Sequence, residues 1–317
     1  MSDVPRRVDT YGVKNKKKKS KWKIVISIVA LIGIAAVGIS AYVGHSMTHP
    51  DKKPIDQFPD EYGMDYEDVE FVSRDGETNL KGWVIEPEKD AKMTVIFSHG
   101  YKGNRFEDHV SFLDMAKDLH DKKYRILMFD FRYSGESEGE MTTIGAKEQL
   151  DLLGAIDYME ETYDEPVSLL GISMGAATSL LAAAQSDVIS VVADSPFSDL
   201  EEYLKENLPV WSNLPSIPFT PLILNIVPKM TDLDPKEASP ISVLEDIAPR
   251  PILFIHNKGD ESIPYFESQK MHDEYPKYFQ IWLPDGVGHV TAYKQNKEDY
   301  IEKVDDFFKA ALKDHKK

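Results

Sequence analysis

The chain has 317 residues, of which 42% are hydrophobic, and it carries a formal net charge of −17. It has no cysteine, which excludes disulfides, thiolate metal sites and a cysteine nucleophile. Residues 1–49 hold nine Lys or Arg and two Asp or Glu, whereas the remainder holds 28 and 52. So acidic a remainder would repel nucleic acid, and its length suits one large α/β domain.

The N-terminal region has the composition of a membrane anchor. A basic cluster (Lys14, Lys16–Lys19, Lys21 and Lys23) precedes a 20-residue run without a charged side chain, Ile24 to Val43. At a helical rise of 1.5 Å per residue this run spans about 30 Å, the thickness of a bilayer core. The alternative is a cleaved signal peptide, with small residues near Gly44–Ser46 that would permit processing. We favour a retained anchor because the apolar region of a signal peptide is usually shorter.

The basic flank also predicts the topology of the chain. Lysines beside an apolar span stay in the cytoplasm, so the rest of the chain is expected outside the cell. The sequence therefore predicts a basic cytoplasmic tail (1–23), a transmembrane anchor (24–43) and a stalk or linker (44–64). Pro50, Pro54 and Pro59 mark the stalk. Residues 65–317 are predicted to form one domain at the cell membrane.

Apolar runs alternate with helical patterns through residues 65–317. Two strands flank Asp75-Gly76, and the later short runs are typical of strands buried on both faces. This alternation predicts an α/β fold with a mainly parallel sheet and helices on both faces. The expected strands are Val69–Val72, Leu80–Ile85, Met93–Phe97, Tyr124–Phe129, Val167–Leu170, Ile189–Ala193, Ile252–Ile255 and Tyr278–Leu283, with helical patterns over Phe106–Ala116, Ala146–Ile156, Ala176–Ala184 and Ile301–Leu312.

The motif Gly171-Ile172-Ser173-Met174-Gly175 lies where the strand Val167–Leu170 ends and an Ala-rich helix begins. A serine on a sharp strand-to-helix turn presents its hydroxyl to solvent, and the flanking glycines relieve the crowded backbone. The motif alone is weak evidence, since it also occurs by chance as a glycine-rich turn. Its position between a strand and a helix predicts Ser173 as a nucleophile.

Residues 198–239 interrupt the alternation without a buried-strand run. Leu208 to Met230 is crowded with apolar residues and five prolines, and it is too apolar to be disordered. We predict a small helical cap over the active site, with Trp211 and Phe219 as candidate substrate-binding residues. The alternative is a packed surface elaboration unrelated to substrate.

A serine nucleophile needs a histidine base, and that histidine needs an orienting group. In a strand-turn-helix setting of this kind the chain order is Ser, then Asp or Glu, then His. Asp260 follows the strand Ile252–Ile255, and His289 lies in a glycine-flanked loop after the strand Tyr278–Leu283. The sequence predicts Ser173, Asp260 and His289 as a catalytic triad.

Other residues are weaker candidates for these roles. Asp194 follows the strand Ile189–Ala193 and is the main alternative for the acid, although capping a turn explains it better. Glu261 is a weaker alternative, and Asp285 is expected to support a turn. His99 and His256 precede or adjoin the wrong loops for the base.

The oxyanion that forms during acyl transfer needs fixed N–H donors. The backbone N–H of Met174 follows the nucleophile at a helix N-terminus. A second donor is expected from the glycine-rich loop after the strand Met93–Phe97, and the backbone N–H of Tyr101 is the candidate.

These motifs in this order resemble the α/β-hydrolase superfamily of serine hydrolases over roughly Val69 to Leu312. Within it the chain resembles membrane-anchored or secreted bacterial esterase-like hydrolases of the Bem46 type. Tyr133 departs from the pattern, since many relatives have glycine there. The matching stretches are His99-Gly100-Tyr101-x-Gly103-Asn104, Asp130-x-Arg132-x-x-Gly135-x-Ser137-x-Gly139, Gly171-x-Ser173-Met174-Gly175-Ala176, Asp194-Ser195-Pro196-Phe197, Gly259-Asp260-x-x-Ile263-Pro264 and Gly288-His289.

The resemblance implies an eight-stranded, mostly parallel sheet and a site without a metal ion or an organic cofactor. It leaves the substrate class open, because this fold supports many activities. The leading interpretation is a membrane-tethered carboxylesterase or lipase-like hydrolase acting on a small or lipid-like ester. A peptidase, amidase or thioesterase on the same fold is the alternative, and a catalytically silent binding protein is the weakest.

Overall fold

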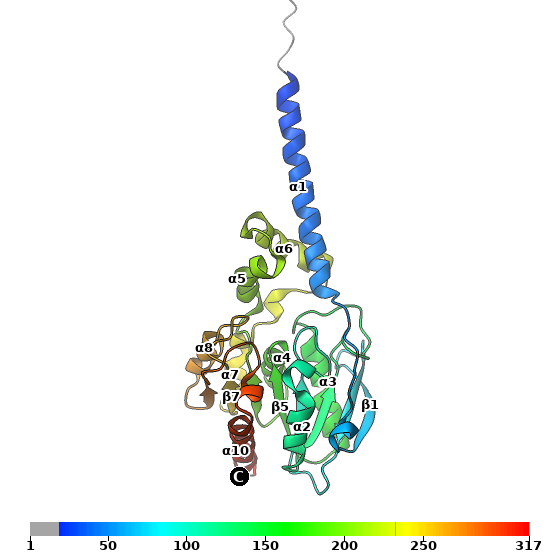
Figure 1. The fold of residues 1–317 in the computed structure, drawn as a ribbon, viewed down its shortest axis with the longest axis vertical. Coiled ribbons are helices and arrows are strands. Elements are labelled where there is room, and N and C mark those ends of the chain that lie inside the picture. Colours follow the sequence, from blue (N-terminus) through cyan, green and yellow to red (C-terminus); the bar gives the residue numbers. More distant parts are fainter. Residues whose placement is uncertain (1–18, 232, 317) are drawn as a thin grey trace, which may run out of the picture.

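A computed structural model describes residues 19–231 and 233–316 and contains one eight-stranded sheet (Figure 1). The greater part of the predicted basic tail, residues 1–18, lies outside the described residues. The strand order is β1-β2-β4-β3-β5-β6-β7-β8, in which β2 is antiparallel to both neighbours and the other pairs are parallel. The strands are β1 (Tyr66–Val72), β2 (Asn79–Ile85), β3 (Thr94–Ser98), β4 (Arg125–Phe129), β5 (Val167–Ile172), β6 (Val191–Asp194), β7 (Ile252–Ile255) and β8 (Phe279–Trp282).

Helices cover both faces of the sheet, each over its own apolar cluster. One cluster includes residues of α3 and α4, and the other includes residues of α2 and α10. The predicted α/β fold, a mostly parallel eight-stranded sheet between two helical layers, is confirmed. The helices are α1 (Lys19–Thr48), α2 (Phe112–His120), α3 (Glu148–Thr162), α4 (Met174–Ala183), α5 (Leu200–Ser212), α6 (Ser216–Met230), α7 (Leu244–Ile247), α8 (Phe266–Glu274), α9 (Ala292–Gln295) and α10 (Lys297–His315).

The central strands bring distant loops to one edge of the sheet. Every residue of β3, β5, β6 and β7 is buried, as expected of parallel strands covered on both faces. Ile172, Asp194, Ile255 and Trp282 are register partners at the carboxyl ends of β5 to β8. The loops that follow these strands therefore begin side by side, which is where open α/β sheets bind ligands.

Some boundaries differ from the sequence expectations. The helix expected from Phe106 begins only at Phe112, although Phe106 and Val110 are buried in the same apolar cluster as α2. The helical spacing correctly predicted which residues share a core. The stretch 106–111, however, is an irregular loop with a short 3₁₀ turn (Asp108–Val110) and not a helix. The expectations did not include α8, which buries only Ser268 and Met271 and therefore has little apolar periodicity.

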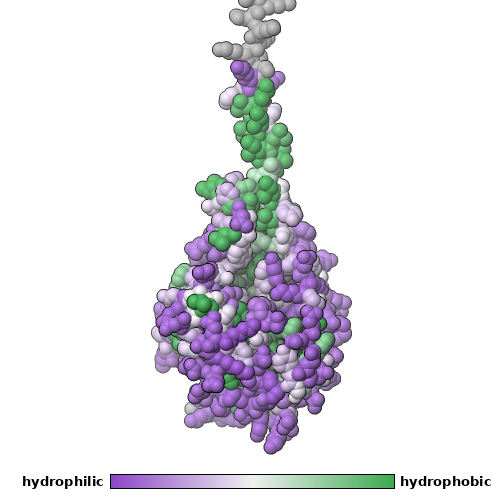
Figure 2. Space-filling view, viewed as in Figure 1, coloured by the Kyte–Doolittle hydropathy of each residue, from purple (hydrophilic) through white to green (hydrophobic). Residues whose placement is uncertain are grey.

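The N-terminal helix α1 is longer than the apolar run from which it was predicted. Lys21–Thr48 is long and apolar enough to cross a membrane, judged by length and composition. Figure 1 shows α1 projecting from the domain, with only its lower part beside other elements, and Figure 2 shows its apolar surface. The expected stalk, 44–64, thus begins inside this helix, and its later part packs on the domain. There, Asn104 Nδ2 donates to the carbonyls of Lys53 and Pro54 at 3.1 and 2.9 Å.

Two helices, α5 and α6, occupy most of the segment for which we predicted a cap. They lie at the end of the domain from which α1 projects, and α6 packs against α1 (Figure 1). Asp199 caps the N-terminus of α5, because its side chain accepts a hydrogen bond from the Glu202 N–H at 2.8 Å. The helices leave Val210, Ile217 and Met230 exposed.

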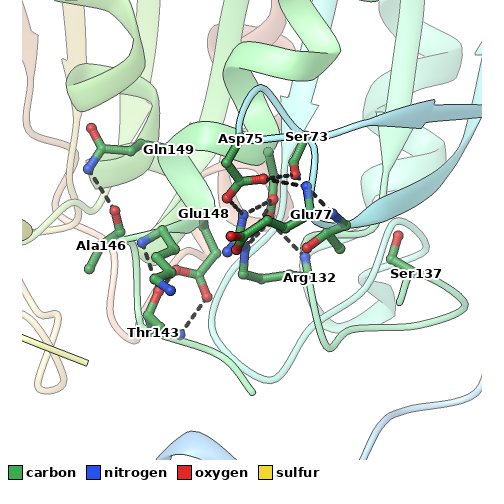
Figure 3. Close-up of polar contacts among 12 residues, drawn as sticks. Ser73, Asp75, Glu77, Arg132, Ser137, Thr143, Ala146, Glu148 and Gln149 are labelled. Carbon is green, nitrogen blue, oxygen red and sulfur yellow. Dashed lines mark hydrogen bonds and ion pairs between the residues drawn. The ribbon is translucent and has the colours of Figure 1, made fainter. Parts of the chain in front are cut away.

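The loop between β4 and α3 is held by buried charged groups rather than by regular structure (Figure 3). Arg132 Nη2 donates to Asp151 Oδ1 at 2.7 Å and to Asp75 Oδ2 at 3.0 Å. Glu148 accepts hydrogen bonds from the Thr143 hydroxyl at 2.6 Å and the Thr143 N–H at 2.8 Å. Because each of these carboxylates has several donors, the loop has a single well-defined path beside the carboxyl edge of the sheet.

Tyr133 adopts the left-handed backbone conformation that favours glycine, with a φ of 57°. Its ring contacts the segment that follows α1. The His49 ring lies edge-on at 5.7 Å, and Lys52 Nζ lies 5.5 Å from the ring centroid. These contacts need a side chain at position 133, and they offset part of the backbone strain that a tyrosine incurs there.

Candidate active site

Ser173 occupies a strained turn between β5 and α4, with φ 52° and ψ −121°. The turn is closed by a hydrogen bond from the Ser173 N–H to the Asp194 carbonyl at 2.8 Å. A Cβ at Gly171 would collide with the backbone of Gly175, and one at Gly175 would collide with the Ser98 carbonyl. Both glycines are therefore required by close backbone approach, and the turn presents the Ser173 hydroxyl at the carboxyl edge of the sheet.

His289 reaches Ser173 from the loop between β8 and α9. Its Nε2 lies 2.8 Å from Ser173 Oγ, and its Nδ1 lies 2.7 Å from Asp260 Oδ2. Gly288 precedes it with a φ of 86°, a conformation that glycine adopts without strain. The side chain of His289 is 23% exposed, so the base can be reached from solvent.

Asp260 is fixed by its own loop after β7. Its Oδ1 accepts hydrogen bonds from the N–H groups of Ser262 and Ile263 at 2.8 and 3.0 Å. Burial alone would raise its pKa, but hydrogen bonds from His256 and His289 and from the Ile263 N–H lower the pKa below its ordinary value. An ionised Asp260 keeps a proton on His289 Nδ1, which leaves Nε2 free to accept the proton of Ser173.

The loop after β3 lies against the nucleophile. A Cβ at Gly100 would stand 3.5 Å from Ser173 Cβ. In the described part of the chain, the N–H groups of Tyr101 and Met174 donate no hydrogen bond to another protein atom. Both N–H groups are therefore available as donors, and their role in binding an oxyanion stays a prediction.

Two residues hold this loop: Asn104 belongs to a stretch that carries the family resemblance, although this role was not predicted for it, and Glu107 was not anticipated. Glu107 Oε2 accepts the Gly100 N–H at 3.0 Å, and Asn104 Oδ1 accepts the Glu107 N–H at 3.2 Å. His99 is buried; its Nδ1 bonds to the Gly100 carbonyl at 2.8 Å, and its Nε2 accepts the Phe131 N–H at 3.0 Å. No sequence signal marks Glu107, because a single glutamate outside a motif looks like a surface residue.

The alternative candidates serve other roles. Asp194 is buried, bonds to Ser195 Oγ at 2.9 Å and to the Tyr300 hydroxyl at 3.2 Å, and is not hydrogen-bonded to His289. Its pKa is raised to about 6, because desolvation outweighs the lowering effect of these hydroxyls and of nearby histidines. Asp285 pairs with Lys258 at 2.8 Å.

His256 is a supporting group rather than a base. It is buried, and its ring bonds to Ser268 Oγ at 2.7 Å and to the Ile263 carbonyl at 2.8 Å. Its Nε2 also lies 3.4 Å from Asp260 Oδ2, so it packs against the acid. Across residues 19–231 and 233–316, no group of three or more His, Asp or Glu side chains is placed to hold a metal ion.

A cleft of about 450 Å³ lies between α1, α5 and the loop that carries Tyr101. Trp211 lines it, whereas Phe219 does not and packs half-buried against the core. The Tyr101 hydroxyl donates to the Met47 carbonyl of α1 at 2.6 Å, and burial raises the pKa of this hydroxyl, which keeps it protonated. The remaining lining residues are Tyr42, Val43, Ser46, Met47, Lys102, Leu208 and Ser212.

Known proteins share the fold of this chain. A family model described as alpha/beta hydrolase fold matches residues 94–233. The esterase Pf2001 of Pyrococcus furiosus has a similar structure, with a TM-score of 0.70 and 25% identity over 83% of this chain and 98% of that one. Est1E of Butyrivibrio proteoclasticus, solved with ferulic acid, has a TM-score of 0.63 and 21% identity over 77% and 99%, which shows a shared fold. The chain has the α/β-hydrolase fold.

Sequence relatives cover most of the chain. The Bacillus subtilis protein YqkD is 28% identical over 237 residues, which are 72% of this chain and 75% of that protein. YfhR of Escherichia coli K12 is 27% identical over 271 residues, or 80% and 86%. The matching fold and the similarity to an esterase structure support a hydrolase activity.

Proposed function

We propose that the chain is a membrane-tethered serine hydrolase that cleaves carboxylic esters through an acyl-enzyme. The observation that carries the proposal is the hydrogen-bonded series from Ser173 Oγ through His289 to Asp260, at 2.8 and 2.7 Å. Its support comes from geometry: a nucleophile on a strained turn, a base within hydrogen-bonding distance, and an ionised carboxylate that orients the base.

In the proposed reaction, Ser173 Oγ attacks the ester carbonyl carbon while its proton passes to His289 Nε2. The negative charge on the carbonyl oxygen is stabilised by the N–H groups of Tyr101 and Met174. The tetrahedral intermediate then collapses, the bond to the alcohol oxygen breaks, and His289 gives that oxygen its proton. Water, deprotonated by His289, attacks the acyl-enzyme and releases the carboxylic acid and the free serine.

The decisive test combines a covalent probe with substrate hydrolysis. The purified wild type should react with a fluorophosphonate probe and hydrolyse p-nitrophenyl acetate, whereas Ser173→Ala should do neither. Loss of a triad residue commonly lowers kcat by about 10⁴–10⁶. Ser186→Ala is the matched control, because Ser186 donates to the Ala182 carbonyl near the far end of α4 from the turn. Equal turnover by wild type and Ser173→Ala would refute the assignment.

The chemical class of substrate is tested with matched oxygen esters, thioesters and amides of one acyl group. We propose that the oxygen ester has the highest kcat/KM. A higher value for the amide would favour the peptidase alternative, and a higher value for the thioester would favour a thioesterase.

The proposal also includes the placement of the domain. We infer that the apolar part of α1, residues 24–43, is a retained transmembrane anchor, with 1–23 in the cytoplasm and the hydrolase domain, 65–317, outside. The cap is proposed to span 198–239. Protease added to intact cells should remove the hydrolase domain and spare a cytoplasmic marker. A protected domain, or a mature chain that begins near Met47, would contradict this topology.

A further inference from the structure

The face of α1 that meets the cap lies within the apolar run. Ala36, Ser40, Gly44 and Thr48 recur every four residues, and all four are buried. The packing is close, since a Cβ at Gly44 would collide with Val227 of α6. Because α6 is the cap helix that packs on α1, the cap reaches at least to the level of Ala36.

The length of the anchor then places the cap relative to the bilayer. If the apolar run Ile24 to Val43 spans the hydrocarbon core, Ala36 lies about 10 Å inside its outer boundary, at 1.5 Å per residue. The cap packs beside this part of α1, so its tip cannot be wholly in water. It must lie at the level of the outer leaflet.

The composition of the cap suits that environment. Leu208 to Pro228 contains no Asp, Glu, Lys, Arg or His, in a domain that is otherwise strongly acidic. Five prolines in this stretch remove backbone N–H donors that lipid could not satisfy. Val210 and Ile217 are 71% and 83% exposed. Figure 2 shows apolar residues gathered on the cap beside α1, above a mostly hydrophilic domain.

The cleft between α1 and α5 begins at the end of the apolar run and reaches the loop that lies beside the serine. Tyr42, Val43 and Met47 of α1 form one wall, and Leu208 and Trp211 of α5 form the other. Tyr101 also lines the cleft, and its neighbour Gly100 lies against Ser173. A hydrocarbon chain in this cleft would run along α1 while its ester group approached the nucleophile.

We propose that the cap tip is immersed in the outer leaflet and that the cleft admits the acyl chain of a bilayer-resident ester directly from the membrane. The occupant is an amphiphilic ester with one long acyl chain. The argument for this occupant is continuity, because Tyr42 and Val43, the last two residues of the proposed span, line the cleft. The inference rests on the proposed function and names the substrate class of that site.

The lipid contact is tested without reference to catalysis. The chain has no cysteine, so a single introduced cysteine is a unique labelling site. Ile217→Cys at the cap tip and Lys89→Cys in the loop before β3 are spin-labelled in the full chain, reconstituted in phosphatidylcholine vesicles. The label at 217 should be more accessible to oxygen than to an aqueous nickel chelate, and the label at 89 should show the reverse. Aqueous accessibility at both positions would overturn the proposal.

The substrate class is tested with a double variant, Val210→Glu with Ile217→Glu, against Val72→Glu as a matched control. Val72 is an exposed valine of β1, which packs on β2 and α3. The double variant should hydrolyse a vesicle-borne p-nitrophenyl palmitate about tenfold more slowly, which corresponds to about 1.4 kcal/mol of lost lipid contact. Its hydrolysis of soluble p-nitrophenyl acetate should stay within about twofold of the wild type, a difference of less than 1 kcal/mol. The control should match the wild type on both substrates.

The outcomes separate this inference from the function on which it rests. Equal loss of acetate and palmitate hydrolysis in the double variant would overturn the lipid route. So would a dimeric wild type that becomes monomeric in the double variant, because this would assign the exposed patch to a second copy of the chain. A wild type inactive on both esters would overturn the proposed function and the substrate class together. Normal acetate hydrolysis with a water-exposed label at 217 would overturn the membrane route alone.

Discussion

Two parts of the molecule differ in which side chains they bury and which they expose: the sheet with its covering helices, here called the lower part, and the upper part formed by α1, α5 and α6. In the lower part, charged groups are buried with partners, as in the set of hydrogen bonds around Arg132. In the upper part, apolar side chains such as Ile217 are exposed instead, and Leu208 to Pro228 carries no charge. The site lies where the two parts meet. The difference is the one expected if the upper part lies against lipid, as proposed above, and the lower part against water.

The largest effect is expected at the triad, at the boundary of the two parts. Asp260→Asn should lower kcat/KM by about 10⁴, because His289 would be held in the wrong tautomer. Asp194→Asn should change kcat/KM far less, since Asp194 bonds to Ser195 and Tyr300 and not to His289. Kinetics of both purified variants on p-nitrophenyl acetate checks this. A greater loss in a folded Asp194→Asn protein would mean that the acid is misassigned.

The second prediction concerns the buried charges of the lower part. Arg132→Ala leaves the Asp151 carboxylate buried without its partner, and it should lower the free energy of unfolding by about 3–5 kcal/mol. Arg74→Ala is the control, because its ion pair with Asp157 is partly exposed and is worth about 0–1 kcal/mol. Denaturant unfolding of the two variants measures the difference. Equal effects would remove the contrast between buried and exposed pairs.

The third prediction uses the pKa of Asp260. Because this pKa is lowered on folding, the ionised carboxylate stabilises the protein fully above its unfolded pKa, near 3.9. That contribution is lost as the pH falls from there toward the lower pKa of the folded state. Between pH 7 and 3.5 the wild type should therefore lose on the order of 1 kcal/mol more stability than Asp260→Asn. The difference is read from denaturation midpoints at both pH values, and parallel losses would contradict it.

The smallest effect is expected in the cap, and it separates two aromatic residues. Trp211 lines the cleft and Phe219 does not. Trp211→Ala should reduce the gain in kcat/KM with acyl-chain length, which is at most about 0.8 kcal/mol per CH₂. Phe219→Ala should lower stability and leave the chain-length profile unchanged. A series of p-nitrophenyl esters from acetate upward checks this, and identical profiles for wild type and Trp211→Ala would exclude contact with substrate.

Much of the site could be predicted because its chemistry depends on local sequence. The turn at Ser173 needs glycine at 171 and 175, and parallel strands bring the loops of Asp260 and His289 to the same edge, so a motif and a chain order sufficed. The residues that hold the loops of the site in place could not be predicted in this way. Glu107 acts on Gly100 only after the loop folds back, which no spacing encodes.

The fold shows the same division. Buried central strands are continuous apolar runs, and the sequence located all of them to within a few residues. The start of α2 was placed too early, because Phe106 and Val110 share its apolar cluster without being helical. The approach of α6 to α1 was also missed. It depends on small residues at four-residue spacing, which within an apolar run look like ordinary transmembrane composition.

The hydrogen bond from Tyr101 to the last turn of α1 means that the proposed anchor also takes part in the structure of the domain. A tether joined through a free linker could be exchanged for any other helix of the same length. Here the helix carries the acceptor for a loop beside the nucleophile, one wall of the cleft and the surface on which α6 rests. Under the proposed function, replacing α1 with an unrelated transmembrane helix should keep the chain at the membrane and still change hydrolysis at the proposed site.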